Sequence, residues 1–305
     1  MIASRLAHVA LSVPDVDAAT EFYGDVFGLT VADDRDGWRF LASGRSRTFE
    51  LALTAGEPGM DHFAFSARGE DALSLARERL ADAGVMFEDV RPAPGIAEGI
   101  SFALPTGHAM ELVVESDPAP FVISALAPTA NHRGVGPVPI EHVTLHAYDI
   151  RANAEMLVDV LDFRISESIR PANAPRWRNT FLRAGQLHHD LGMIPTDEDR
   201  PGLHHLCFAV PSVSELIAMS DMIASRGMQL DSSPGRHVSG NNVFLYFKDP
   251  FGHRLEVNTD MVRVDAAAAP LVRDAPAPFD AWRPGRPPAL ENGTPARDVR
   301  VAAER

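Results

Sequence analysis

The feature that most constrains the fold is an internal repeat, in which the first part of the chain resembles a later part. Residues 8–15, HVALSVPD, align without a gap with residues 142–149, HVTLHAYD. Farther along, HFAF aligns with HLCF, and PTGHAME aligns with PFGHRLE. Matches that recur in the same order along both halves indicate two copies of one structural module.

The repeat also predicts where the modules begin and end. A stretch rich in Pro and Ala separates the two copies and is typical of a linker, and a second such stretch follows the second copy. We therefore expect an amino-terminal module at 1–117, a linker at 118–139, a carboxy-terminal module at 140–264 and a tail at 265–305. The tail is either disordered or draped over the second module, with Phe279 and Trp282 as anchors.

Within each module, strand-like and helix-like hydropathy patterns alternate. Residues 6–13 alternate as in a strand, and an apolar helical stripe follows over 16–27, with Asp15 as N-cap and Gly28 at its end. The same succession recurs three times, with helices expected near 71–83, 150–161 and 213–226. This pattern predicts an α+β fold in which each module has two βαβββ units that form a curved mixed sheet around a cavity.

Composition excludes several classes of partner. The chain of 305 residues has a formal charge of -14, which argues against nucleic acid and anionic membranes. Cys207 is the sole cysteine, so a disulfide framework is excluded, as expected in a reducing compartment. The sequence contains neither a signal-peptide pattern nor an apolar run of the roughly 18 residues that a spanning helix needs. We therefore expect a cytoplasmic protein.

Strand alternation turns three potential metal ligands toward one cavity. In EHVTLH, the apolar side chains should pack against the helices, which leaves His142 facing the cavity. The same alternation in HHLCFA turns His205 inward and His204 outward, and in RLEVNT it turns Glu256 inward. A lone strand histidine is usually structural, but two imidazoles and a carboxylate of one parity favour a 2-His-1-carboxylate metal site.

These segments resemble the type I extradiol, meta-cleaving catechol dioxygenases of the vicinal oxygen chelate superfamily. The resemblance extends over residues 1–264 and is most specific in GRHVSGNNVFLYFKDPFGHRLE, residues 235–256. The segments LHH at 203–205 and HHD at 188–190 also look like family segments. The resemblance implies ring cleavage beside the diol of a catecholic substrate, with O2 as co-substrate, in the degradation of aromatic compounds.

The resemblance also implies a role for individual residues. His142, His205 and Glu256 would be the ligands of Fe(II), although Mn(II) accepts the same set. His189 would be the acid/base group beside the oxygen, with His188 as an alternative because the spacing to His205 is slightly longer than expected. Two further side chains would hydrogen-bond the substrate oxygens, namely His237 and Tyr246. Family members tend to form homo-oligomers.

The amino-terminal module repeats the ligand positions but not the rest of the site. The repeated ligands are His8, His62 and Glu111. Ser101 stands where Tyr246 does, residues 90–99 have no histidine to match His237, and residues 47–50 offer none for His189. We therefore expect this module to be catalytically silent. The sequence leaves open whether it holds a metal, and it favours the interpretation of the repeated ligands as a remnant of gene duplication.

Two other classes of function fit the same fold. One is a metal-dependent isomerase, epimerase or thiol transferase, which usually needs no equivalent of His189, His237 and Tyr246. The other is a non-enzymatic protein that binds small molecules and needs no metal.

Several other residues are less informative. Cys207 fits a small wall residue better than a ligand, and His146 could line the pocket. Residues 176–178 would either contact a substrate substituent or form a solvated strand. His108 and His253 occupy matching turns, so we expect them to be structural.

Overall fold

The computed structural model describes residues 1–117, 135–136, 138–170, 176–274, 278–284 and 293–300. The linker expected at 118–139 lies almost entirely outside these residues, so the module boundaries stay predictions. In the part of the chain that is described, no helix has the length and apolar character needed to cross a membrane.

The amino-terminal module forms one sheet of eight strands. Its elements are β1 (Ala3–Val13), α1 (Val16–Phe27), β2 (Thr30–Arg35), β3 (Trp38–Ala42), β4 (Leu51–Ala55), β5 (Gly59–Ala67), α2 (Glu70–Asp82), β6 (Phe87–Asp89), β7 (Ile96–Ala103) and β8 (Ala109–Glu115). The strand order is β2-β3-β4-β1-β5-β8-β7-β6. Two βαβββ units therefore join at the antiparallel pair of β1 and β5, as predicted.

The carboxy-terminal module repeats this arrangement. Its elements are β9 (Ile140–Ala147), α3 (Ile150–Leu161), β10 (Arg164–Ile169), β11 (Thr180–Arg183), β12 (Leu191–Pro195), β13 (Gly202–Ala209), α4 (Val213–Ser225), β14 (Leu230–Arg236), β15 (Val243–Lys248) and β16 (Arg254–Thr259). The order β14-β15-β16-β13-β9-β12-β11-β10 again places two βαβββ units side by side. The predicted two-module α+β fold is confirmed.

The repeated helices begin with the same local signal. In α1, the Asp15 carboxylate accepts a hydrogen bond from the Ala18 amide at 2.9 Å, and in α3 Asp149 accepts one from the Ala152 amide at 3.0 Å. Such N-caps satisfy amide groups that have no partner within the helix. The helix α1 ends at Gly28, whose φ of 67° is easily adopted without a Cβ. The helix predicted for 16–27 is therefore confirmed at both ends.

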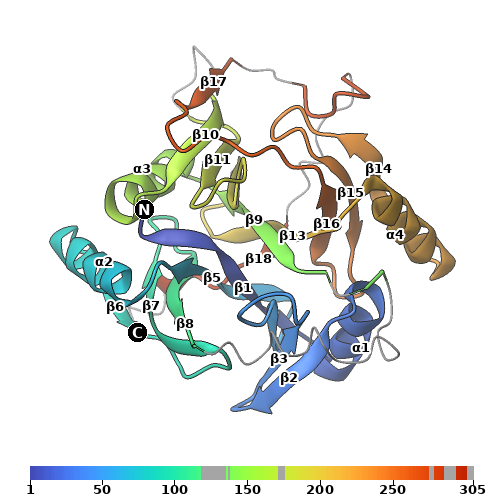
Figure 1. Cartoon of the computed structure of the whole chain (residues 1–305), viewed down its shortest axis with the longest axis horizontal. Helices are drawn as coiled ribbons and strands as arrows, with labels where there is room; N and C mark the ends of the chain where they lie inside the picture. The colour runs from blue at the N-terminus through green and yellow to red at the C-terminus, as the bar shows by residue number, and fades with distance from the viewer. Residues whose placement is uncertain (118–134, 137, 171–175, 275–277, 285–292, 301–305) are drawn as a thin grey trace.

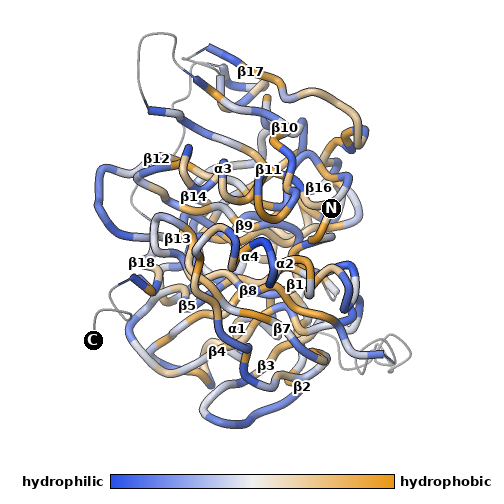
Figure 2. The backbone as a smooth tube through the Cα atoms, turned by 90° about the vertical axis from the view of Figure 1, so that its left-hand side faces the viewer, coloured by the Kyte–Doolittle hydropathy of each residue, from blue (hydrophilic) through white to orange (hydrophobic). Residues whose placement is uncertain are grey.

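Buried contacts hold the modules together. Figure 1 shows α2 beside α3 on one flank and α1 beside α4 on the other, with the sheets between them. The phenol of Tyr23 in α1 donates to Asp249 of the other module at 2.8 Å, and Phe27 stacks on Phe208 with ring centroids 4.0 Å apart. Hydrophobic segments gather at the centre of the molecule, with hydrophilic ones toward its edges (Figure 2). One core therefore extends across both modules.

The matching turns of the two modules are held by buried histidines. His253 Nδ1 lies 2.8 Å from an Asp249 oxygen, and His108 Nδ1 lies 2.8 Å from the Thr106 hydroxyl. Thr106 also receives a hydrogen bond from the Asn153 amide at 2.7 Å, which links the first module to α3. The structural role predicted for His108 and His253 is confirmed.

The described parts of the tail lie on the protein. Strand β17 (Leu271–Arg273) pairs parallel with β10, and β18 (Thr294–Pro295) pairs with β13. Backbone hydrogen bonds also join residues 279–281 to residues 236–238. The draped interpretation is therefore confirmed for these segments. Of the two expected anchors, Phe279 packs its ring 4.6 Å from that of His237, whereas Trp282 is 54% exposed and meets the second module through the Arg236 guanidinium, 5.8 Å from its ring.

Substitution Tyr23→Phe should lower the free energy of unfolding by about 1–3 kcal/mol, because it removes a buried hydrogen bond to a carboxylate. Urea denaturation would measure the change. The control is Ser225→Ala, which removes an exposed hydroxyl that donates to the Met222 carbonyl at 2.8 Å; there we expect a change of less than about 0.5 kcal/mol. Equal losses in both variants would show that the Tyr23–Asp249 bond does not stabilise the module interface.

Candidate metal centre

Three neighbouring strands bring His142, His205 and Glu256 together. The Nε2 atoms of the histidines lie 3.2 Å apart, and they lie 3.5 Å (His142) and 3.0 Å (His205) from Glu256 Oε2. Two ligands that are each about 2.1 Å from one metal and at right angles lie about 3.0 Å apart. The three atoms therefore have the spacing of one face of an octahedral site. All three residues are buried.

The charges of this cluster fit a cation. Burial alone raises the pKa of Glu256, but hydrogen bonds with His142, His205 and His237 outweigh it and hold that pKa well below its usual value. Burial also lowers the pKa of His142, yet hydrogen bonds to Glu141 and Glu256 raise it to about 9. Burial lowers the pKa of His205 to about 4, so this imidazole is neutral and offers a lone pair. The ionised Glu256 carboxylate favours a positive charge at this point, which a divalent cation would supply. Imidazole and carboxylate donors suit Fe, Mn and Zn ions.

The predicted inward parity of the three ligands agrees with their convergence, but the outward direction predicted for His204 is wrong. Its ring lies 4.8 Å from that of His205 and 6.5 Å from that of Tyr246. The register between β13 and β9 shifts between Leu203 and His205. At such a bulge two residues oppose one partner, so simple alternation fails locally and His204 lies on the same face as His205.

His237 and Tyr246 form a second layer beside the carboxylate. Tyr246 pairs directly with Glu256 across β15 and β16. His237 Nε2 lies 3.1 Å from the Tyr246 hydroxyl and 3.5 Å from Glu256 Oε1. Burial, reinforced by the charge of Glu256, raises the pKa of Tyr246 well above its usual value. The phenol therefore keeps its proton at neutral pH and can donate a hydrogen bond.

His189 comes from the far end of the strand order, because it precedes β12, next to β9, whereas Tyr246 is on β15, next to β16. Its ring centroid is 4.4 Å from that of His142. Burial, together with the charge of His142, holds the pKa of His189 well below its usual value, so this imidazole is neutral. His188 Nε2 lies 3.4 Å from Glu167, and its Nδ1 lies 3.0 Å from Nδ1 of His189. The contacts thus favour His189 as the residue beside the triad, with His188 behind it.

Two residues that contact this site were not predicted from the sequence to do so. Asn242 is buried and donates its side-chain amide to Glu256 Oε1 at 3.0 Å. The ring of Phe279 stacks over Tyr246 at 6.5 Å and meets the His237 ring at 4.6 Å. Asn242 carried a usable signal, since it precedes Tyr246 by four positions and strand parity places both on one face. No sequence pattern predicted the contact of Phe279 with the site.

The structure also bears on the less informative residues Cys207, His146 and Arg176, none of which belongs to the triad. Burial raises the pKa of the Cys207 thiol well above its usual value, so it stays protonated and suits a wall better than a ligand. His146 packs against His204 at 4.9 Å. Residues 176–178 precede β11 and are not part of a strand, contrary to the interpretation as a solvated strand. Arg176 is nevertheless solvated, since it forms an exposed ion pair with Asp197 at 3.1 Å.

Comparison with known proteins identifies the class. The chain belongs to the Glyoxalase/Bleomycin resistance protein/Dioxygenase superfamily, whose model matches residues 5–112 and 139–257. The two matches coincide with the two repeated modules. This membership agrees with the resemblance found in the motifs.

Its relatives narrow the class further. The chain is 28% identical over 263 residues to the metapyrocatechase of Pseudomonas sp. (strain CF600), covering 83% of this chain and 85% of that protein. It is also 28% identical over 271 residues to a manganese-dependent 2,3-dihydroxybiphenyl 1,2-dioxygenase of Geobacillus genomosp. 3, covering 83% and 84%. Its fold matches homoprotocatechuate 2,3-dioxygenase of Brevibacterium fuscum, solved with 3,4-dihydroxyphenylacetate, with a TM-score of 0.84 and 22% identity. The match covers 98% of this chain and 95% of that chain.

Substitution Asn242→Ala should weaken metal binding about 10- to 100-fold, because it removes the hydrogen bond that orients a ligating carboxylate. Titration of metal-free protein with Mn(II), followed by electron paramagnetic resonance of the free ion, would measure the affinity. Truncation of an exposed amide in Gln229→Ala is the matched control. If Asn242→Ala binds Mn(II) as tightly as the control, the amide does not support the site.

Proposed function

We propose that this protein is an extradiol ring-cleavage dioxygenase that inserts both atoms of O2 into a catecholic substrate beside its diol. The observation that carries the proposal is that further polar groups surround the buried triad: the His189 ring lies against His142, and His237 and Tyr246 lie beside Glu256. Metal binding alone requires only the triad. The additional donors match the needs of a reaction in which a diol and oxygen are held together.

The triad suits a divalent cation, and we propose Fe(II), with Mn(II) as the alternative that one relative's name supports. When bound, such an ion would acidify a chelated diol and pass electron density from the ring toward O2. The homo-oligomeric state and the cytoplasmic location stay predictions from the sequence.

His237 and Tyr246 would position the diol. The phenol of Tyr246 retains its proton, and its oxygen lies 3.1 Å from His237 Nε2. When Nε2–H donates to that oxygen, the Tyr246 hydroxyl is left to donate to the substrate at one edge of the site. Donors fixed in a buried site stabilise a developing oxyanion without reorganisation of solvent. Phe279 packs on both rings and thereby limits the orientations that they can adopt.

His189 would handle the proton. As a neutral imidazole it has one lone pair and one N–H group, so it can accept a proton from the substrate hydroxyl and return it later in the reaction. The contact of its Nδ1 with Nδ1 of His188 at 3.0 Å fixes the ring, and Glu167 in turn holds His188. We therefore assign the acid/base role to His189 and a positioning role to His188.

The alternative functions are less well supported. An isomerase, epimerase or thiol transferase would use the triad. Such a function would not explain why His189, His237 and Tyr246 lie beside it. A protein that only binds small molecules would leave unexplained why two imidazoles and a carboxylate converge in a buried site with the spacing of metal ligands. Oxygen consumption distinguishes the proposed reaction from both.

The direct test is oxygen uptake by anaerobically purified protein that has been reloaded with Fe(II), given a panel of catechols. We expect stoichiometric uptake together with the visible absorbance of a ring-opened product. Glu256→Ala should lose both the activity and the bound metal at this site, because one of three ligands is removed. Bound metal without oxygen uptake on any catechol would reject the proposed reaction.

Substitution His189→Ala should reduce kcat about 100- to 10,000-fold, the usual contribution of a general acid–base group. Binding of metal and of the catechol under anaerobic conditions should persist, because His189 is not a ligand. Rapid-mixing absorbance would measure both steps. Should His188→Ala lose more turnover than His189→Ala, the two assignments would have to be exchanged.

A further inference from the structure

The amino-terminal module contains a second triad with almost the same geometry. Its ligand atoms come from β1, β5 and β8, which are neighbours in the sheet as β9, β13 and β16 are in the other module. The Nε2 atoms of His8 and His62 lie 3.3 Å apart, and they lie 3.7 and 3.5 Å from Glu111 Oε2. The corresponding distances in the triad of His142, His205 and Glu256 are 3.2, 3.5 and 3.0 Å. The three donors can therefore meet one ion.

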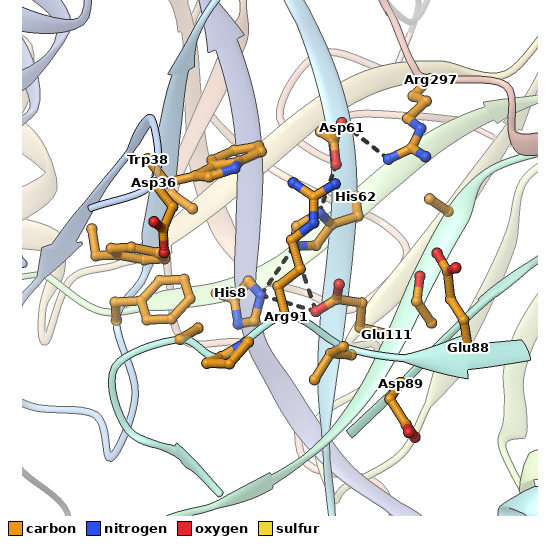
Figure 3. Close-up of a pocket in the computed structure, with 18 of the residues that line it drawn as sticks. His8, Asp36, Trp38, Asp61, His62, Glu88, Asp89, Arg91, Glu111 and Arg297 are labelled. Carbon is orange, nitrogen blue, oxygen red and sulfur yellow. Dashed lines mark hydrogen bonds and ion pairs between the residues drawn. The ribbon is translucent and has the colours of Figure 1, made fainter. Parts of the chain in front are cut away.

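This second triad is part of the wall of a cavity of about 640 Å³ (Figure 3). That volume is in the range of sites for small molecules. Aromatic rings form another part of the wall, with Trp38, Phe40 and Phe49 among its residues. The side chains of His62 and Glu111 are 16% and 15% exposed, so an ion held by them would have coordination positions open toward the cavity.

A hydrogen-bonded chain orients one of the ligands. His62 Nδ1 lies 2.9 Å from Asp61, and Asp61 lies 3.5 Å from the Arg297 guanidinium of the tail. A carboxylate behind a histidine is the usual arrangement at metal sites, because it fixes the ring and strengthens the donor nitrogen. Figure 3 shows Asp61 between His62 and Arg297. The carboxy-terminal tail therefore contributes to a site in the amino-terminal module.

The groups needed for oxygen chemistry are replaced here. Phe49 precedes β4 as His189 precedes β12, and its ring lies 4.3 Å from His8, as the ring of His189 lies 4.4 Å from His142. Ser101 pairs with Glu111 where Tyr246 pairs with Glu256. The cavity thus retains the triad without an imidazole at the acid/base position or a phenol beside the carboxylate.

We propose that His8, His62 and Glu111 hold a second divalent metal ion, which binds an aromatic ligand with two chelating oxygens in this cavity without cleaving it. The triad supplies one face of the coordination sphere, and the open positions face a cavity with aromatic walls. The site goes beyond the ring-cleavage function and is independent of it, because it uses other residues in another module.

Counting of bound Mn(II) in the full-length protein tests the metal site. After removal of metal by a chelator, the wild type should bind two ions per chain, and Glu256→Ala and Glu111→Gln should each bind one. Their combination should bind none, and circular dichroism would verify folding of each variant. Wild type that binds one ion, lost completely in Glu256→Ala and fully retained in Glu111→Gln, would overturn the proposal.

The Asp61→Ala variant provides a second test that leaves all three ligands in place. Loss of the carboxylate behind His62 should weaken Mn(II) binding at the second site about 10- to 100-fold, measured in the Glu256→Ala background where only that site remains. The matched control is Asp89→Ala, which removes an exposed carboxylate of the same cavity. Equal affinity in Asp61→Ala and Asp89→Ala would contradict the proposed arrangement.

The ligand is tested with 4-nitrocatechol, whose absorbance changes when it chelates a metal. Glu256→Ala loaded with Mn(II) should bind it at one site and leave it intact in air. Binding of 4-nitrocatechol should disappear in the double variant that carries Glu256→Ala and Glu111→Gln, and also when the metal is removed from Glu256→Ala. Absence of metal-dependent binding, or conversion of the probe by Glu256→Ala, would overturn this part of the proposal.

Discussion

The buried carboxylate of Glu256 is the constraint on which the rest of the site depends. An ionised carboxylate inside a sheet is tolerated only when charges or donors surround it. Here His142, His205 and His237 approach it, and Asn242 donates to it. Because these groups come from β9, β13 and the connection between β14 and β15, the surrounding sheet must hold these elements in register. The curved sheet and the packed helices outside it serve this requirement.

Duplication of the module explains both the architecture and the unequal chemistry. The same strand order places a triad in each half, and the modules share one core through pairs such as Phe27 and Phe208. The modules differ at a few positions, most clearly where Phe49 takes the place that His189 has in the second module, so only the second site has an imidazole that could exchange a proton. The fold therefore sets where the ligands lie, and individual side chains determine which chemistry each site can support.

Much of this was predictable from the sequence, and the exceptions have physical causes. Periodicity and caps located the helices, and strand parity predicted that His142, His205 and Glu256 converge, because both signals depend on nearby residues only. Parity failed at His204, where a bulge adds a residue to β13, and alternation cannot reveal such an insertion. The sequence predicted that the tail could lie on the second module, but not that Phe279 packs over Tyr246. No repeat or periodicity links these two distant segments.

The central claim is that both oxygen atoms of O2 enter one organic product. The most direct measurement is a single turnover of the Fe(II)-loaded protein with a catechol under ¹⁸O2, with immediate borohydride reduction to prevent exchange of the aldehyde oxygen, followed by mass spectrometry. The account predicts a ring-opened product that carries two ¹⁸O atoms. A product that carries one labelled atom or none would contradict it.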